Sequence, residues 1–190
     1  MAKTLISGNL SLLLNNKTVG WSHNIVLNTS NHILSHVLRG NPSGLSYHIR
    51  GMYVEFQNGG QLITDLPDPL PENGMEYYRQ LTNSPNRDYL RIALAVISPQ
   101  YNESSPNQIE LVCHAPITTN RGVGGLEFSE TVGSRIYGGA LVAMPTMGTA
   151  TDDPEKDVLW SRGYLPTDKQ LTASQSTQLG IAWKINLNTQ

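Results

Sequence analysis

The sequence predicts a mainly β protein: a β-sandwich or jelly-roll-like arrangement of antiparallel sheets, with one short helix near residues 31–39 and long loops. About eight short segments of β-type residues are separated by turn signals. Only 15% of the 190 residues are charged, below the roughly 25% usual for soluble domains. The polar remainder is rich in Asn, Gln, Ser, Thr and Gly, which suits β-structure with hydrated loops.

The clearest strand is the last one, over residues 179–187. Apolar residues alternate there with Gly, Ala, Lys and Asn, and Trp183 stands at the centre of the apolar series. A period of two is typical of a strand with one buried face. Leu179, Ile181, Trp183, Ile185 and Leu187 are therefore expected to face the core.

Seven further strand segments are expected along the chain. Each combines apolar or β-branched residues with a turn signal or proline at its end. They cover residues 10–14, 25–27, 47–56 with a break at Gly51, 89–97, 109–114, 126–128 and 136–144.

One segment has helical rather than strand spacing. Ile33, Leu34, Val37 and Leu38 fall on one helical face. Ser30 can cap the N-terminus of this helix, and Gly40 can take the left-handed position after its end. The sequence therefore predicts a helix over residues 31–39.

Long loops are expected at about residues 58–88 and 145–178. The first contains four prolines and a helical turn near residues 75–81, and the second contains an acidic stretch over residues 152–157. No linker or repeat divides the chain, so residues 1–190 are expected to form a single domain.

The charge pattern argues against nucleic-acid binding. The formal net charge is −2, and Lys and Arg are scattered rather than clustered. Binding to a phosphate backbone requires clustered cations. No apolar stretch approaches the roughly 20 residues of a membrane span, and no signal peptide is evident. We expect synthesis in a cytoplasm, without direct contact with nucleic acid or membrane.

No residue set predicts catalysis. A nucleophile elbow, an ordered set of Ser, His and acid, and a phosphate-binding loop are all missing from the sequence. Cys113 is the single cysteine and precedes His114. Neighbours in a strand point to opposite faces, so a buried, inert thiol is expected. We expect no catalytic residue, no cofactor and no enzymatic activity.

Metal binding is not expected either. His32 and His36 are four residues apart, as metal ligands on a helix can be, but no third ligand accompanies them. The acidic residues of 152–157 lack the spacing of a calcium loop and are expected to be solvated. Among the glycines, Gly122–Gly125 is expected to form a hinge or tight turn, and the pair Gly138-Gly139 a β-bulge or a close strand contact.

The order of several segments resembles a known class of proteins. Residues 24–27 precede the helix, VGGLEF at 123–128 precedes RIYGGAL at 135–141, and the chain closes with LGIAWKINL at 179–187. This order resembles small virion structural proteins of tailed bacteriophages, which occur as tail, baseplate, fibre and capsid-decorating components. The resemblance implies a virion location, with tail, baseplate or fibre attachment slightly favoured over capsid decoration.

The expected partners are other copies of the chain, in a homo-oligomer such as a trimer, and neighbouring virion proteins. Low-charge, amide-rich chains suit polar, symmetric contacts. The two long loops are the expected contact regions, because long loops on a scaffold often carry function. The candidate interface residues are Leu66, Tyr77, Tyr78, Trp160, Tyr164 and Leu165. A carbohydrate-binding or receptor-binding β-sandwich module is the alternative, and aromatic residues gathered on one exposed face would favour it.

Overall fold

The fold is mainly antiparallel β-structure, as predicted. The computed structural model describes residues 4–14, 17–18, 22–26, 30, 33–35, 46–59, 74–93, 96–101, 108–117, 119–146, 154–165, 170–172 and 179–189. Its strands are β1 (Thr4–Leu14), β2 (Lys17–Thr18), β3 (Ser22–Val26), β4 (Ser46–Asn58), β5 (Arg87–Ala93), β6 (Val96–Tyr101), β7 (Gln108–Pro116), β8 (Ser134–Thr146), β9 (Val158–Tyr164), β10 (Leu171–Thr172) and β11 (Leu179–Thr189). Helix α2 (Gly74–Leu81) and the 3-10 turn η1 (Pro154–Lys156) accompany them.

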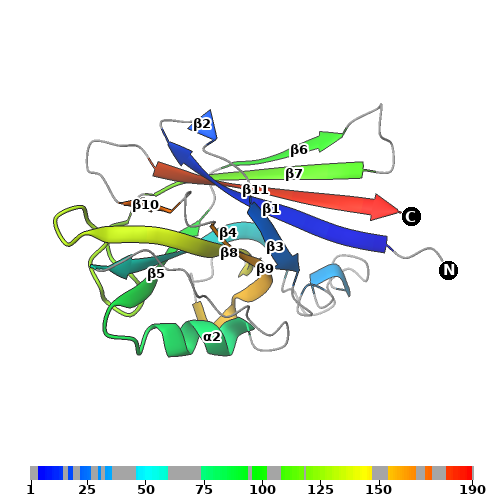
Figure 1. The fold of residues 1–190 in the computed structure, drawn as a ribbon. Coiled ribbons are helices and arrows are strands. Elements are labelled where there is room, and N and C mark those ends of the chain that lie inside the picture. Colours follow the sequence, from blue (N-terminus) through cyan, green and yellow to red (C-terminus); the bar gives the residue numbers. More distant parts are fainter. Residues whose placement is uncertain are drawn as a thin grey trace.

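The strands follow one hydrogen-bonded path, β5-β4-β8-β9-β3-β1-β11-β7-β6, with β10 paired to β8 and β2 to β1. Strand β3 pairs with β1 on one side and β9 on the other. It therefore joins a terminal half, made of β1, β2, β6, β7 and β11, to a middle half, made of β4, β5, β8, β9 and β10. The terminal half lies over one face of the middle half, and α2 lies against the opposite face (Figure 1).

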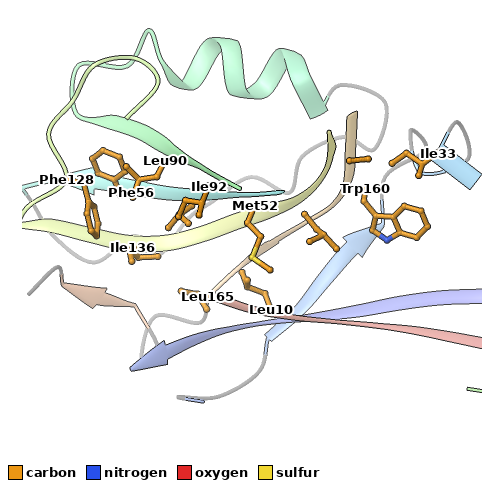
Figure 2. Close-up of a cluster of buried hydrophobic side chains, with 13 residues drawn as sticks. Leu10, Ile33, Met52, Phe56, Leu90, Ile92, Phe128, Ile136, Trp160 and Leu165 are labelled. Atoms are coloured by element: carbon orange, nitrogen blue, oxygen red, sulfur yellow. The ribbon is translucent and has the colours of Figure 1, made fainter. Parts of the chain in front are cut away.

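The middle half is buried on both faces because its side chains alternate between two cores. On β4, Met52, Val54 and Phe56 face the terminal half and pack in the cluster that includes Leu10 of β1. Figure 2 shows Leu10 directed toward Met52 and Leu165. Tyr53, between them, belongs to the second cluster, under α2. A strand that is buried on both faces is expected to be apolar at nearly every position, and residues 52–56 follow this pattern except at Glu55.

Three predicted elements agree closely with the structure. Strand β1 ends at Leu14, immediately before the expected turn, and β11 covers the expected final strand. Helix α2 begins within one residue of the helical turn expected at 75–81 and ends where that turn does. Residues 33–35 are helical, with Ile33 buried, whereas Val37, Leu38 and both helix histidines lie outside the described residues.

Other expectations are corrected by the structure. The single strand expected at 89–97 is two strands, β5 and β6, which lie at opposite ends of the strand order. The segment 126–128 is not a strand, and it forms one isolated bridge between Arg121 and Glu127. The loop expected at 145–178 contains β9, which lies between β8 and β3. The strand at 89–97 was predicted as one because an apolar run does not indicate where the chain crosses from one half of the sheet to the other. Strand β9 was missed because it carries Arg162 at a position that a search for apolar periodicity treats as polar.

Candidate functional site

The strongest concentration of buried polar groups lies on the face of the middle half that α2 covers. Four elements contribute to it: β4, β8, β9 and α2. We call it the tyrosine–ion-pair cluster, and its members are Glu55, Arg162, Tyr77, Tyr78, Tyr137 and Tyr164.

A fully buried ion pair is the centre of this cluster. Arg162 Nε donates to Glu55 Oε1 at 2.7 Å, and Arg162 Nη2 donates to Glu55 Oε2 at 2.8 Å. Both side chains have 0% exposure. The two residues are 107 positions apart in the sequence. Such a two-bonded pair fixes the relative position of β4 and β9 through both distance and angle.

Helix α2 completes the surroundings of the pair. Tyr78 donates its hydroxyl hydrogen to Glu55 Oε1 at 2.6 Å, and Tyr77 donates to Oε2 at 3.2 Å. The Arg162 guanidinium lies 3.6 Å from the ring centre of Tyr77 and 4.1 Å from that of Tyr164. Each carboxylate oxygen of Glu55 therefore accepts two hydrogen bonds, and the Arg162 guanidinium lies against two aromatic rings.

Two glycines and a bulge in β8 make room for this arrangement. The register shifts so that Glu55 pairs with Gly138 and Phe56 with Ile136, leaving Tyr137 as the extra residue. A Cβ on Gly138 would lie 2.9 Å from the Tyr164 ring and 2.8 Å from the carbonyl oxygen of Gly163. A bulge or a close strand contact was expected at Gly138-Gly139, and the structure has the close contact at Gly138 and the bulge beside it, at Tyr137.

A second buried ion pair lies near the first. Asp157 accepts from Arg91 Nε at 2.6 Å, from Arg91 Nη2 at 2.8 Å and from the Tyr53 hydroxyl at 2.6 Å. Tyr53 also packs edge-on against Tyr78, with ring centres 4.9 Å apart. The two ion pairs are therefore linked through an aromatic contact rather than being isolated.

Burial controls the ionisation of the surrounding tyrosines. Loss of solvent, followed by repulsion from the Glu55 carboxylate, raises the pKa of Tyr77 and Tyr78 well above the ordinary value of 10.0. Burial likewise raises the pKa of Tyr164 to about 12, with Glu55 as the second cause. These three hydroxyls remain protonated near neutral pH, and those of Tyr77 and Tyr78 donate to the carboxylate.

Two polar atoms of the cluster have no hydrogen-bond partner: Arg162 Nη1 and the Tyr137 hydroxyl. Both residues are fully buried. A general acid or base must reach the proton that it transfers, and here the carboxylate oxygens are already engaged by Arg162 and two tyrosines. The cluster can therefore orient elements and hold charge, but it does not present a reactive carboxylate to solvent.

A third buried carboxylate organises a loop. Asp88 Oδ1 accepts from the backbone N–H groups of Tyr89 at 2.8 Å and Gly124 at 2.9 Å, and Oδ2 accepts from Leu126 at 3.0 Å. A Cβ on Gly122 would overlap the Asp88 carboxyl group. Gly125 has a φ of 95°, which favours glycine. Of the two expectations for Gly122–Gly125, the structure has the tight turn, closed around Asp88.

The candidate interface residues are mostly inside the chain. Tyr78 is fully buried, Trp160 is 4% exposed and Leu165 is 3% exposed. Tyr77 and Tyr164 are half-buried against Arg162, and Leu66 lies outside the described residues. The structure thus brings Tyr77, Tyr78 and Tyr164 together around an internal ion pair and places Trp160 and Leu165 in the core under the terminal half. All five described residues make contacts within their own subunit, and their role at an interface stays a prediction.

Other singled-out residues are placed as follows. Asp157, expected in a solvated acidic loop, is buried and paired with Arg91, whereas Glu155 is exposed. Cys113 lies in β7 and pairs with Trp183 in the β11 register. Within the described residues, no group of three His, Cys, Asp or Glu side chains could hold a metal ion, and no helix is long and apolar enough to cross a membrane.

Sequence reasoning missed Glu55 and Arg162. The available signal was the position of Glu55 between Val54 and Phe56, in a run that is apolar on both faces. A carboxylate in such a run requires a buried partner. Nothing in the sequence indicated which of the scattered arginines supplies it.

Comparison with family models, curated proteins and solved structures finds no match to this chain.

Proposed function

We propose that this chain is a non-enzymatic structural protein that assembles with copies of itself and with neighbouring proteins of a tailed-phage virion. The non-enzymatic part of this proposal rests on the way in which the buried charged side chains are bonded within the chain. The described residues include four buried charged side chains, Glu55, Asp88, Asp157 and Arg162. Each one is bonded to another part of the same chain and fixes one element against another.

An assembly role is supported by composition and architecture together. A surface rich in amides and hydroxyls forms wet, polar contacts with identical neighbours, and a mainly β scaffold with internal ion pairs offers a rigid body for such contacts. The two-layered packing of the sheet halves supports assignment to a β-sandwich, or to a jelly roll in the wider sense. The virion location rests on the resemblance in segment order.

The carbohydrate-binding alternative receives no support from the described tyrosines. Tyr53, Tyr78 and Tyr137 are fully buried, and Tyr89 is 5% exposed. A sugar-binding platform requires aromatic faces that are open to solvent. These four tyrosines instead pack in the interior.

The test is to locate the chain in purified particles. An antibody against the chain should label intact virions, and a reconstruction of the particle should contain density that fits the middle half with α2. Label at the tail or baseplate would distinguish that site from capsid decoration. Purified virions that lack the chain would contradict the proposal.

A further inference from the structure

A second group of polar side chains lies on the sheet face that α2 covers, two residues along β4 from Glu55. Gln57 of β4 is opposite Arg87 of β5 and Arg135 of β8, and Arg135 is in turn opposite Thr172 of β10. We call these four residues the arginine row. Its first three members are half-buried and Thr172 is exposed, so solvent reaches the row.

The two arginines of the row approach each other across β4. Arg87 Nε donates to Gln57 Oε1 at 3.1 Å, and the Arg87 guanidinium lies 6.0 Å from the ring centre of Tyr137. Tyr137 belongs to β8, the strand that also carries Arg135. Because β4 lies between β5 and β8, a guanidinium that reaches a ring of β8 has crossed the strand between the two arginines. Two positive charges are therefore gathered beside β8.

The described carboxylates do not balance these two charges. The described ion pairs include neither arginine of the row. Glu55, on the same face, is already paired with Arg162. Asp88 faces the other side of the sheet and fastens the loop whose Val123 N–H donates to the Tyr89 carbonyl at 2.9 Å. Since like charges on one sheet face repel each other, an anion bound between the two arginines would stabilise the row.

We propose that the arginine row binds a tetrahedral oxyanion, phosphate or sulfate, either free or as an ester group of a larger molecule. Arg87 keeps four N–H donors after its bond to Gln57. Arg135 offers five, because no described side chain bonds to its guanidinium, and the Thr172 hydroxyl can donate as well. Such a set of donors suits a ligand with several acceptor oxygens, whereas the two oxygens of a carboxylate are satisfied by one arginine.

Charge favours a single phosphate or sulfate group over a nucleic-acid backbone. A phosphate monoester carries about 1.5 to 2 negative charges near neutral pH, which two arginines neutralise. Proteins that bind duplex DNA contact roughly 6–10 phosphates, far more than the row can serve. The formal net charge of −2 also disfavours a long polyanion.

Isothermal titration calorimetry of the full chain tests the site, with inorganic phosphate as the probe in a Tris-chloride buffer. The wild type should bind one phosphate with a Kd below about 1 mM, and Arg87→Gln and Arg135→Gln should each raise the Kd at least about tenfold. Added NaCl should also weaken binding, because the site is partly exposed and its charges are screened. Without phosphate, Arg135→Gln should keep the wild-type melting temperature, since its guanidinium has no described partner to lose.

Arg50→Gln is the matched control. Arg50 is exposed and lies on the same strand, seven residues from Gln57, which is roughly 20 Å along a strand. This variant removes the same charge and should leave the Kd for phosphate unchanged. Equal weakening by Arg50→Gln and Arg135→Gln would show that phosphate responds only to net charge, and would overturn the site.

Three further probes identify the ligand chemistry. Sulfate should bind like phosphate. Tighter binding of phenyl phosphate than of inorganic phosphate supports an ester group of a larger molecule, and the reverse order supports the free ion. Acetate that binds as tightly as phosphate overturns the tetrahedral assignment, and so does a lack of saturable phosphate binding up to about 10 mM. None of these outcomes alters the proposed assembly role, which is tested separately on particles.

Discussion

At the scale of single residues, the main feature is the way in which charge is buried. Glu55 and Arg162 bind each other on a sheet face whose other buried side chains are mainly aromatic and aliphatic, apart from the nearby Arg91–Asp157 pair. Replacing such a pair with apolar residues can cost little, but removing one partner leaves an uncompensated buried charge. We therefore infer that the pair orients α2 and β9 more than it adds net stability.

The first prediction concerns this pair. Glu55→Gln should lower the free energy of unfolding by about 3–5 kcal/mol, because Arg162 remains charged in the interior. The matched control is Glu76→Gln, since the Glu76–Arg79 pair is 52% and 68% exposed and should contribute less than about 1 kcal/mol. Urea denaturation measures both. Equal effects of the two substitutions would contradict a structural role for Glu55.

The second prediction concerns alkaline pH. Burial raises the pKa of Tyr89 and Tyr164 from 10.0 to about 12. Above pH 10 the unfolded chain releases these protons while the folded chain retains them. Stability should therefore be constant below about pH 10 and fall progressively as pH rises through about 12. Melting temperatures across this range, with tyrosinate absorbance, measure the effect. A stability that is unchanged up to about pH 11.5 would contradict it.

At the scale of elements, α2 and the segment 119–133 both act as covers for the middle half. Helix α2 closes one face, with Tyr78 and Leu81 buried in the cluster that includes Tyr53 and Tyr89. The segment 119–133 closes the β5 edge and places Phe128 against Phe56, with ring centres 5.2 Å apart. Each cover depends on a buried carboxylate of the sheet, Glu55 for α2 and Asp88 for the loop.

The third prediction tests the loop. Asp88→Ala should destabilise the protein by about 2–3 kcal/mol, because one buried and two partly buried N–H groups lose their acceptor. Amide exchange at Gly124 and Leu126 should accelerate more than exchange in β4. Glu127→Ala is the control, since that side chain is exposed on the same loop. Unchanged exchange at Gly124 in Asp88→Ala would show that the loop does not depend on this carboxylate.

At the scale of the whole molecule, the order of the strands brings the two ends of the described chain together. Strands β1 and β11 pair along their entire length, from Thr4 opposite Thr189 to Leu14 opposite Leu179. Strand β9, which lies in the stretch expected to be a loop at 145–178, joins β8 to β3 and carries Arg162. Deleting this strand would therefore remove the hydrogen-bonded connection between β8 and β3, and would not simply shorten a surface loop.

The fourth prediction concerns the junction of the two halves. Trp183 pairs with Leu10 of β1, and Leu10 is fully buried in the core between the halves. We expect Trp183→Ala to cost about 3–5 kcal/mol, as large-to-small substitutions in a core do. Lys184→Ala, one position along, should cost less than about 1 kcal/mol. Similar losses for both would show that the apolar series of β11 does not face the core.

The sequence by itself determined the mainly β class and the positions of its most regular elements. The alternation around Trp183 located β11, the glycine pair at 138–139 located the bulge in β8, and Asn15-Asn16 located the end of β1. Each of these signals is local, because period, turn chemistry and glycine tolerance depend on a few consecutive residues.

Only the tertiary structure decided how charge is buried and which segments are surface loops. Glu55 meets Arg162 across 107 positions, and Tyr53 meets Asp157 across 104. A charged residue in a loop-like stretch and one at the centre of a sheet have the same local sequence signal. What separates them is a partner supplied by a distant strand, because a buried charge is tolerated only where the fold brings its counter-ion and hydrogen-bond donors to it.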